Sequence, residues 1–397
     1  MGDSLESSHQ PLYASEGGTL IPEAKDEHFM QRALELARHG IALTSPNPCV
    51  GAVIVAPDCT IAGEGSHTYD NKTHAEILAL KHAGNHARGA TLYLNLEPCS
   101  HQGRTGPCAD AVIASGIRRV VCSMQDPNPQ VAGQGFDKLR AAGIQVQVGL
   151  LEAEARKLNE AFANYIRHQT PFVLLKSAMT LDGKIAASPN PAPSDESRGS
   201  TRANWITGEA ARAHVQQLRH ENNAILTGIG TILADDPLLT DRTGQSRRRP
   251  LLRVILDSHL RLPLDSQIAR TAQGDVLVFC ASKDHERRQQ MEQLGIRVEN
   301  APESPGGHLD LTAILRRLAE LEITSVMIEG GSHLNTAALD DGIVDKVMLY
   351  VAPKIFGQAA IPFTAALKET LALRQTTVHH FGKDFAVEAY LKNPYRE

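Results

Sequence analysis

Residues 74–76 read His-Ala-Glu, and residues 97–108 read Glu-Pro-Cys-Ser-His-Gln-Gly-Arg-Thr-Gly-Pro-Cys. The imidazole of His74 and the thiols of Cys99 and Cys108 are ligands of the kind that zinc prefers. A structural zinc site normally has four protein ligands, whereas a catalytic site has three and leaves one position for water. Bound zinc lowers the pKa of that water to about 7, so hydroxide is available at neutral pH. The two stretches therefore predict a catalytic zinc site.

Glu76 is predicted to be the catalytic acid and base of this site. From the first turn of a helix its carboxylate can reach the water on the metal, take its proton and pass it to a leaving amine. One His, two Cys and a Glu are typical of zinc nucleobase deaminases. Eight residues separate the two cysteines, where the general deaminase signature has two. This insert carries His101 and Arg104, which suit a phosphorylated substrate.

The composition is that of a globular protein with an ordinary core. The chain has 397 residues, 42% of them hydrophobic, and a formal net charge of -5. The negative balance argues against a general nucleic-acid binder, because such a protein needs a basic surface. No apolar run approaches the roughly 18 residues of a membrane span, and six cysteines are too few for a disulfide scaffold. We expect a cytoplasmic enzyme without nucleic-acid or membrane partners.

Hydrophobic periodicity around the zinc motif predicts an α/β domain. The expected helices are 27–39, 74–83, 108–115, 136–142 and a single long helix 151–168, and the expected strands are 50–56, 91–96, 119–124 and 144–151. Residues 1–25 are rich in Ser, Glu, Gly and Pro without a secretory pattern and are expected to form a flexible tail. Pro171 stops the last helix, which places the domain boundary between residues 169 and 170.

A second α/β series follows that boundary and is expected to fill residues 170–397. The expected strands are 172–177, 224–228, 252–257, 275–280, 324–329, 346–351 and 385–391, and the expected helices are 209–220, 285–294, 313–321 and 333–339. Residues 188–202, rich in Pro and Ser, and residues 244–250 are predicted to be mobile loops.

The second series lacks the usual dinucleotide fingerprint, because Gly228 and Gly230 are followed by Leu233 where a third glycine is needed. A different anion site is predicted further on. The strand that ends at Glu329 runs into Gly330 and Gly331, and a helix follows at once. Glycines let a ligand approach the backbone, and a helix N-terminus offers free N–H groups to a phosphate.

Seven motifs of this chain resemble those of the bacterial bifunctional riboflavin-biosynthesis deaminase/reductase family. In the first half they are residues 45–51, 97–108 and 124–133, and in the second half residues 176–183, 205–207, 233–240 and 328–331. The resemblance spans about residues 26–392. It implies a zinc-dependent pyrimidine deaminase domain with a cytidine-deaminase-like three-layer α/β/α fold, followed by an NADPH-dependent reductase domain with a dihydrofolate-reductase-like α/β fold.

The resemblance also implies an activity. The first half would deaminate 2,5-diamino-6-ribosylamino-4(3H)-pyrimidinone 5′-phosphate, and the second would reduce the ribosyl group of 5-amino-6-(5-phosphoribosylamino)uracil to ribityl. One zinc ion per chain, NADPH, a small phosphorylated pyrimidine as substrate and a homo-oligomer, either dimer or tetramer, are expected.

Site residues follow from the same resemblance. The residues expected to bind NADPH are Ala178, Trp205, Thr231, Asp235, Ser258, Gly331, Ser332, His333, Leu334, Asn335, Thr336 and Ala337. Those expected to contact substrate are Asn47, His101, Arg104, Lys176, Ala203, Arg219, Leu239, Arg242 and Glu329. Lys176 and Asp235 are both candidates for the proton donor of the reduction. At Ala203 the family often has a small hydroxyl residue, so Ser200 or Thr201 is a candidate to replace that contact.

Two other classes of protein compete with this interpretation. A nucleoside or tRNA-base deaminase with an unrelated C-terminal domain would need a basic surface and usually the short cysteine spacing. A structural zinc module joined to a nucleotide-binding domain would need a fourth protein ligand and would tolerate replacement of Glu76.

Overall fold

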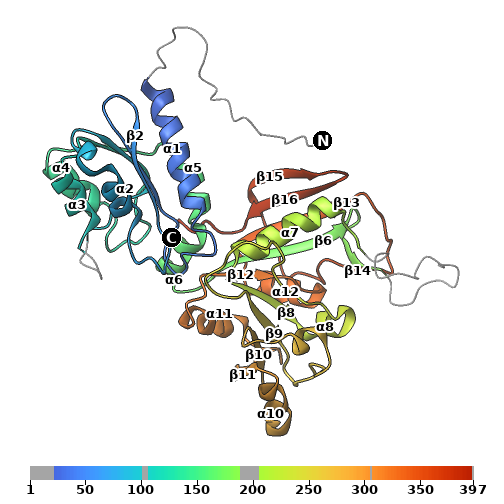
Figure 1. Ribbon diagram of the computed structural model, residues 1–397. Helices are drawn as coiled ribbons and strands as arrows, with labels where there is room; N and C mark the ends of the chain where they lie inside the picture. Colours follow the sequence, from blue (N-terminus) through green and yellow to red (C-terminus); the bar gives the residue numbers. More distant parts are fainter. Residues whose placement is uncertain (1–21, 101–105, 188–204, 305, 396–397) are drawn as a thin grey trace, which may run out of the picture.

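The computed structural model describes residues 22–100, 106–187, 205–304 and 306–395 (Figure 1). Its first half is built on a five-stranded sheet with the strand order β2-β1-β3-β4-β5. The strands are β1 (Gly51–Val55), β2 (Ile61–Ser66), β3 (Thr91–Leu96), β4 (Arg119–Met124) and β5 (Gln145–Val148). The pairings of β1 with β2 and β3 are antiparallel, whereas β3, β4 and β5 are parallel.

Helices cover both faces of this sheet, because β1 is apolar on both sides. Ala52 and Ile54 belong to the core beneath α2 (Ala75–Ala83), α3 (Cys108–Ser115) and α4 (Gln134–Ala141). Val53 and Val55 belong to a second core, under α1 (Pro22–Arg38) and α5 (Glu152–Leu158). Alternate residues of a strand point to opposite faces, so one strand supplies both cores. The expected three-layer α/β/α domain is confirmed.

Strand β2 was missed by the sequence analysis because glycines interrupt its pattern. These glycines let helix α2 approach the sheet closely. A Cβ atom on Gly63 would lie 2.2 Å from the carbonyl oxygen of Ala79, and one on Gly65 would lie 2.2 Å from that of Ala75. The N-terminus of α2, with the residues that precede it, is thereby fixed against the sheet.

We expect Gly65→Ala to destabilise the protein by about 3 kcal/mol, because the new methyl group meets helix backbone rather than a flexible side chain. Calorimetric unfolding of the full chain measures this loss. Gly306→Ala is the matched control, since its nearest atoms would lie 3.8 Å away. Equal melting temperatures for the two variants would contradict the prediction.

The second half is built on a nine-stranded sheet with the order β11-β10-β9-β8-β12-β6-β13-β16-β15. The strands are β6 (Phe172–Thr180), β8 (Ala224–Gly228), β9 (Leu252–Leu256), β10 (Val276–Cys280), β11 (Ile296–Asn300), β12 (Ser325–Ile328), β13 (Lys346–Ala352), β15 (Arg374–Phe381) and β16 (Asp384–Tyr390). From β11 to β13 all neighbours are parallel, and β16 and β15 add an antiparallel edge.

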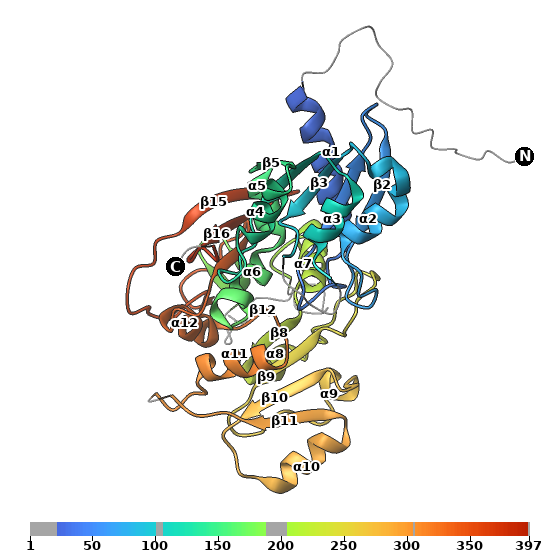
Figure 2. The same cartoon turned by 90° about the vertical axis from the view of Figure 1, so that its left-hand side faces the viewer.

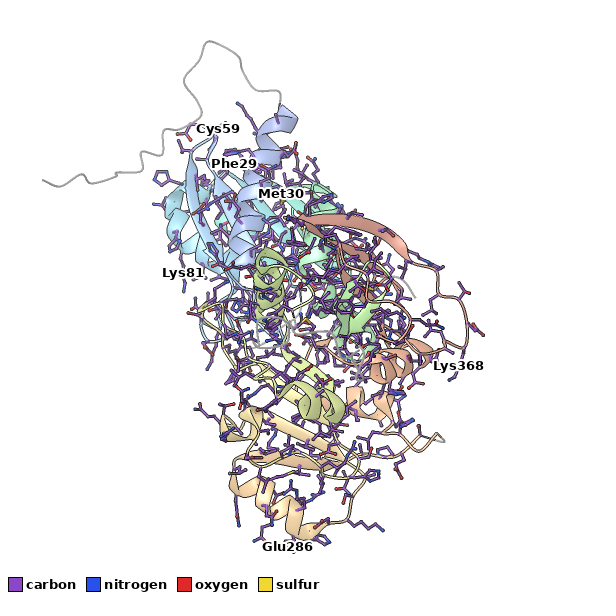
Figure 3. The ribbon with its side chains drawn as sticks, turned by 90° about the vertical axis from the view of Figure 1, so that its right-hand side faces the viewer. Phe29, Met30, Cys59, Lys81, Glu286 and Lys368 are labelled. Atoms are coloured by element: carbon purple, nitrogen blue, oxygen red, sulfur yellow. The ribbon has the colours of Figure 1, made fainter. Side chains whose placement is uncertain are left out.

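Two cores lie on the two faces of this larger sheet, as expected for an α/β domain. One lies under α7 (Glu209–Glu221), α8 (Ile229–Asp235), α9 (Gln267–Arg270) and α10 (His285–Gln293). The other lies under α11 (Leu311–Glu320) and α12 (Ser332–Asp340). Figures 1 and 2 show the two sheets in separate parts of the molecule. Figure 3 places Cys59 of the first half and Glu286 of the second at opposite ends, with Phe29 and Met30 on α1.

Several boundaries differ from the sequence analysis. Helix α1 begins at Pro22, so residues 22–25 belong to it rather than to the tail. The long helix 151–168 is wrong as a single element, since α5 ends at Leu158 and α6 runs over Glu160–His168. The amide of Asn159, which is 2% exposed, instead binds the N–H and C=O of Cys49 at 2.8 and 3.1 Å. These two hydrogen bonds compensate for the break in the helix.

The sequence analysis also missed three strands of the second half that lack a long apolar run: β7 (Lys184–Ala186), β14 (Ile361–Pro362) and β15. Strand β11 was missed as well. Strands β7 and β14 pair with each other in a separate two-stranded sheet. β15 lies at an open edge and is largely exposed, so it carries no hydrophobic alternation. Among the described residues, no helix combines the length and the apolar character that crossing a bilayer requires.

Candidate active sites

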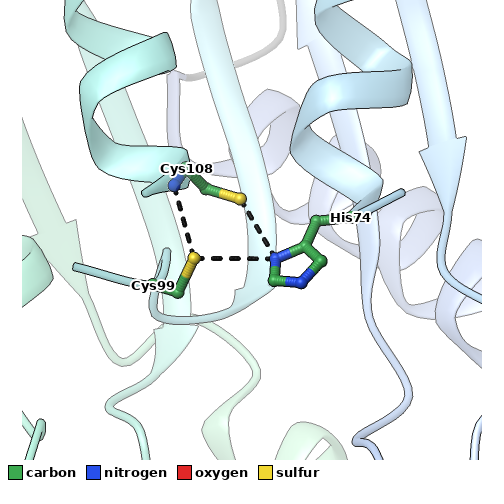
Figure 4. A group of neighbouring side chains, drawn as sticks. All are labelled: His74, Cys99 and Cys108. Atoms are coloured by element: carbon green, nitrogen blue, oxygen red, sulfur yellow. Dashed lines mark hydrogen bonds between the residues drawn. The ribbon is translucent and has the colours of Figure 1, made fainter. Parts of the chain in front are cut away.

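The three predicted zinc ligands meet at the ends of three elements of the first half (Figure 4). His74 directly precedes α2, Cys99 follows β3, and Cys108 opens α3. The Nδ1 atom of His74 lies 3.1 Å from Sγ of Cys108 and 3.6 Å from Sγ of Cys99. Among the described residues, these three side chains form a group that could hold a metal ion. Their ligand atoms all lie within 4.8 Å of one another.

These distances fit zinc. With Zn–N near 2.05 Å and Zn–S near 2.3 Å, a nitrogen and a sulfur on a tetrahedral ion lie about 3.6 Å apart. The separation of His74 and Cys99 matches that value, and the separation of His74 and Cys108 is slightly shorter. Three donors of this chemistry leave one position of the tetrahedron for water, as in a catalytic site.

The two thiols of this site have pKa values shifted in opposite directions. The backbone N–H of Cys108, at the start of α3, lies 3.3 Å from Sγ of Cys99. The hydrogen bond from the Cys108 thiol, together with His74, lowers the pKa of Cys99 to about 4 despite burial. The same hydrogen bond and burial raise the pKa of Cys108. The lowered pKa favours the thiolate form of Cys99, and binding of a divalent cation would favour loss of the Cys108 proton as well.

Glu76 lies in the first turn of α2, as the spacing predicts, and is 4% exposed. Burial raises the pKa of its carboxyl group, although His74 acts in the opposite direction. A raised carboxyl pKa suits a group that must both accept and donate a proton near neutral pH.

Asn47 is joined to the zinc ligands through a residue that the sequence analysis missed. Its Nδ2 atom lies 3.1 Å from Nε2 of His67, whose Nδ1 lies 3.0 Å from the carbonyl oxygen of Thr73. The His67 ring also packs edge-on against the ring of His74, with centroids 5.6 Å apart. His67 directly follows strand β2, which the sequence analysis missed. Recognising that strand would have indicated that His67 lies at this site.

Glu97 is a second residue whose role the sequence analysis missed, although it was quoted in the motif. Its two carboxylate oxygens accept four backbone N–H groups, from Asp126, Gly133, Gly135 and Phe136, at 2.8–3.3 Å. A Cβ atom on Gly135 would lie 2.2 Å from the carbonyl oxygen of Pro98, so the start of α4 lies directly on the Pro98–Cys99 segment. Glu97 thereby clamps the loop that supports one zinc ligand.

We expect Glu97→Gln to weaken zinc binding about 10- to 100-fold, the usual effect of changing a residue that orients a ligand. A carboxamide cannot accept all four N–H groups, and each buried donor left without a partner costs about 1–3 kcal/mol. Competition with a chelator measures the affinity, and the reduction catalysed by the other half is the internal control. Glu35→Gln, on the exposed face of α1, should bind zinc like the wild type. Unchanged affinity in Glu97→Gln would refute the role.

The second half brings together three of the predicted substrate residues. Glu329 accepts hydrogen bonds from Nε and Nη2 of Arg219 at 2.8 and 3.1 Å and from Nζ of Lys176 at 3.3 Å. Their side chains are 10–13% exposed. Burial alone would raise the pKa of Glu329, but the two cations outweigh it and lower the pKa to about 2. We call Lys176, Arg219 and Glu329 the reductase cluster.

The predicted NADPH residues follow strands whose carboxyl ends share one edge of the nine-stranded sheet. Ala178 lies near the end of β6, Thr231 and Asp235 lie on α8 just after β8, and Ser258 follows β9. In parallel sheets, ligands bind outside this edge. The parallel register also aligns Ile328, just before Glu329, with Leu226 of β8 and Leu175 of β6.

Residues 331–337 form the start of α12, and no side chain among the described residues caps it. No described atom lies within 4 Å of the position that a Cβ atom on Gly331 would take, so this backbone is open towards the described part of the chain. Among the predicted contacts, His333 is exposed, whereas Ser332 and Asn335 are buried. Asn335 donates to the carbonyl oxygen of Phe363 at 3.0 Å, and its buried Oδ1 atom has no hydrogen-bond partner in the described part of the chain.

The other predicted cofactor and substrate residues of the second half differ in their exposure. Trp205 is 54% exposed and lies under the guanidinium of Arg212, 5.0 Å from its ring centroid. Leu239 is 4% exposed, and Arg242 is exposed. Three predicted substrate residues lie outside the described part of the chain: His101, Arg104 and Ala203.

Comparison with known protein families assigns a family to each half of the chain. Residues 23–124 match the model of the cytidine and deoxycytidylate deaminase zinc-binding region, and residues 171–387 match the RibD C-terminal domain. The fold and the sites thus define a two-domain enzyme, a zinc-binding deaminase joined to a reductase. The second match rules out the alternative of an unrelated C-terminal domain.

Full-length relatives identify the family. The riboflavin biosynthesis proteins RibD of Aquifex aeolicus and Escherichia coli are each 40% identical over 91% of this chain and 97% and 98% of their own lengths. A structure of Acinetobacter baumannii RibD has a TM-score of 0.78 and 36% identity, and covers 93% of this chain and 99% of its own.

A Thermotoga maritima structure described as a diaminohydroxyphosphoribosylaminopyrimidine deaminase/5-amino-6-(5-phosphoribosylamino)uracil reductase has a TM-score of 0.76 and 38% identity, with the same coverage. The chain belongs to the RibD family and is a bifunctional deaminase and reductase of riboflavin biosynthesis.

Proposed function

We propose that the first half hydrolyses an exocyclic amine of 2,5-diamino-6-ribosylamino-4(3H)-pyrimidinone 5′-phosphate. The second half then reduces the ribosyl group of the product, 5-amino-6-(5-phosphoribosylamino)uracil, to ribityl with NADPH. The observation that carries this proposal is the meeting of His74, Cys99 and Cys108 in a chain that also holds the reductase cluster. Both steps act on one phosphorylated compound, which is a physical reason to join the two domains.

In the deaminase site His74, Cys99 and Cys108 would hold zinc, which supplies the Lewis acid that makes water nucleophilic at neutral pH. Glu76 would take the proton from that water and deliver it to the leaving ammonia, and burial equips it for both steps. Asn47, supported by His67, would orient the pyrimidine ring. His101 and Arg104, on the insert between the cysteines, would face the phosphate.

In the reductase site NADPH would supply a hydride to the opened ribose carbonyl. The open backbone at Gly331 and the uncapped N-terminus of α12 suit its phosphate groups. Ala178, Trp205, Thr231, Asp235, Ser258 and residues 332–337 would complete the cofactor site. Arg219, Leu239, Arg242 and Glu329 would bind substrate. We favour Lys176 over Asp235 as proton donor, because Lys176 is part of the reductase cluster whereas Asp235 is exposed on α8.

We propose a boundary between residues 169 and 170 for the two domains, since α6 ends at His168 and β6 begins at Phe172. We also propose a homo-oligomer, for which the exposed edge strand β15 offers an unpaired backbone. A reducing cytoplasm suits the free thiols of the zinc site.

Incubation of the enzyme with the diamino-pyrimidinone ribotide tests both steps. With zinc alone, we expect ammonia release and a mass gain of about one unit, because an amine is replaced by oxygen. Addition of NADPH should add about two further units, because a hydride and a proton are taken up. Removal of zinc should abolish the first change. No mass change with the zinc-loaded enzyme would refute the proposed substrate.

A further inference from the structure

The loop that carries Asn47 is held by residues of the second half. The hydroxyl of Ser45 donates to Oδ1 of Asn223 at 2.9 Å and lies 3.2 Å from the hydroxyl of Thr324. The carbonyl oxygen of Ala42 accepts the backbone N–H of Arg248 at 3.0 Å. Residues 42–47 are therefore positioned by contacts that the first half cannot supply alone.

The side chain of Arg248 contacts both residues 42–47 and the neighbouring residues 67–70. Its Nη1 atom donates to the carbonyl oxygen of Ser45 at 2.7 Å, and its Cζ atom lies 3.2 Å from the ring centroid of Tyr69. Tyr69 is joined to the first loop, because its N–H donates to the carbonyl oxygen of Leu43 at 3.0 Å. One guanidinium, 14% exposed, thus links residues 42–47 with residues 67–70, which begin with His67.

Close packing does not fix the loop by itself, because a cavity of about 470 Å³ lies beside it. The first half contributes Ser45 and Asn47 to the lining of this cavity, and the second half contributes Asn223 and Thr324. On the side of the cavity the loop lacks packed neighbours, so the hydrogen bonds of Ser45 contribute more to its position.

The residue before Arg248 is hydrogen-bonded to the second half, so this part of the loop predicted over residues 244–250 is anchored. Nη1 of Arg247 donates to the carbonyl oxygens of Arg219 and His220 at 3.0 and 2.8 Å, and Nη2 donates to that of Asn222 at 2.7 Å. These carbonyls end helix α7, whose Arg219 side chain binds Glu329 of the reductase cluster. Arg247 therefore holds the segment to the second half while Arg248 reaches into the first.

We propose that Arg248, supplied by the reductase half, is a positioning residue of the deaminase site. It clamps residues 42–47 against residues 67–70 and so sets the Asn47–His67 pair that faces the substrate. The inference rests on the proposed role of Asn47 in binding the pyrimidine.

The test is Arg248→Ala in the full-length, zinc-loaded enzyme. Loss of a charge-assisted hydrogen bond and of the stacked guanidinium should raise the KM for deamination about tenfold. The kcat should change little, because the substrate contacts rather than Glu76 are displaced. Hydrogen exchange at residues 42–47 and 67–70 should become faster, while zinc content and reductase kinetics stay unchanged. A merely structural loss would lower the active fraction, and with it kcat, but leave KM in place.

Two further variants sharpen the result. Arg249→Ala is the matched control, because Arg249 pairs with exposed Glu322 within the second half and should leave KM and exchange unchanged. Arg248→Lys keeps the charge without the planar fork and should give an intermediate KM. If Arg248→Ala lost reductase turnover through misfolding, the same two measurements on Arg248→Lys would decide.

The outcomes separate this inference from the proposed function. Wild-type KM and exchange in Arg248→Ala, or an equal change in Arg249→Ala, would overturn the role of Arg248. A wild-type enzyme that released no ammonia would overturn the proposed substrate instead. In that case the exchange of residues 42–47 would still decide whether Arg248 orders the loop.

Discussion

Glu76→Gln is expected to keep its zinc and to lose about 10²- to 10⁴-fold in kcat for ammonia release, the usual contribution of general acid–base catalysis. The amide is close to the carboxylate in size but cannot take a proton from water or return it to the leaving amine. Glu76 is buried in the first turn of α2, so bulk water is poorly placed to replace it. Steady-state ammonia release and metal analysis of the same preparation measure the effect.

Reduction by the other half serves as an internal standard in this experiment, because it reports the concentration of folded enzyme. Glu35→Gln changes an exposed glutamate on α1 and should deaminate like the wild type. Turnover by Glu76→Gln within a few-fold of the wild type would remove the acid–base role.

Glu329→Gln is expected to destabilise the second half by about 3–5 kcal/mol, the usual cost of leaving a buried charge unpaired. The variant leaves Arg219 and Lys176, 10% and 13% exposed, without their shared anion. Reductase kcat/KM should fall by about tenfold or more, because both cations lose the partner that orients them. Urea unfolding followed by the fluorescence of Trp205, the single tryptophan, measures the stability.

The pH dependence of stability offers an independent check of the reductase cluster. The pKa of Glu329 is lowered from its ordinary value of 4.5 to about 2, so the folded state favours the ionised form. Its contribution is complete above about pH 4.5 and is lost as the pH falls towards 2. The wild type should therefore lose more stability than Glu329→Gln over that interval. Parallel curves would contradict the pairing, and Glu322→Gln, at an exposed glutamate, should follow the wild type.

The zinc site could be predicted because its candidate ligands lie in two short sequence motifs. His74 and Glu76 lie on either side of the first residue of α2, and eight residues of sequence separate the two cysteines. Ligand type and spacing therefore restricted the choice before any tertiary contact was known. The three-layer fold could be predicted for a similar reason, since the continuous apolar run of β1 requires helices on both faces.

The supporting residues could not be predicted, because their partners are distant in sequence. Glu97 binds backbone groups about 30 to 40 residues further on, which no side-chain pattern reveals. Strand β2 was hidden by Gly63 and Gly65, which the close approach of α2 requires. The break at Asn159 depends on Cys49, more than one hundred residues earlier.

The sequence by itself predicted a His-Cys-Cys metal site and a glutamate beside it, the α/β character of both halves and, through its motifs, the family. Those properties depend on local spacing and residue chemistry. Only the tertiary structure decided which side chains support the candidate site: His67 beside Asn47, Glu97 on the backbone of Gly135, and Arg248 across the two halves. Such contacts arise when separate elements pack, so they depend on the whole arrangement rather than on any one stretch of chain.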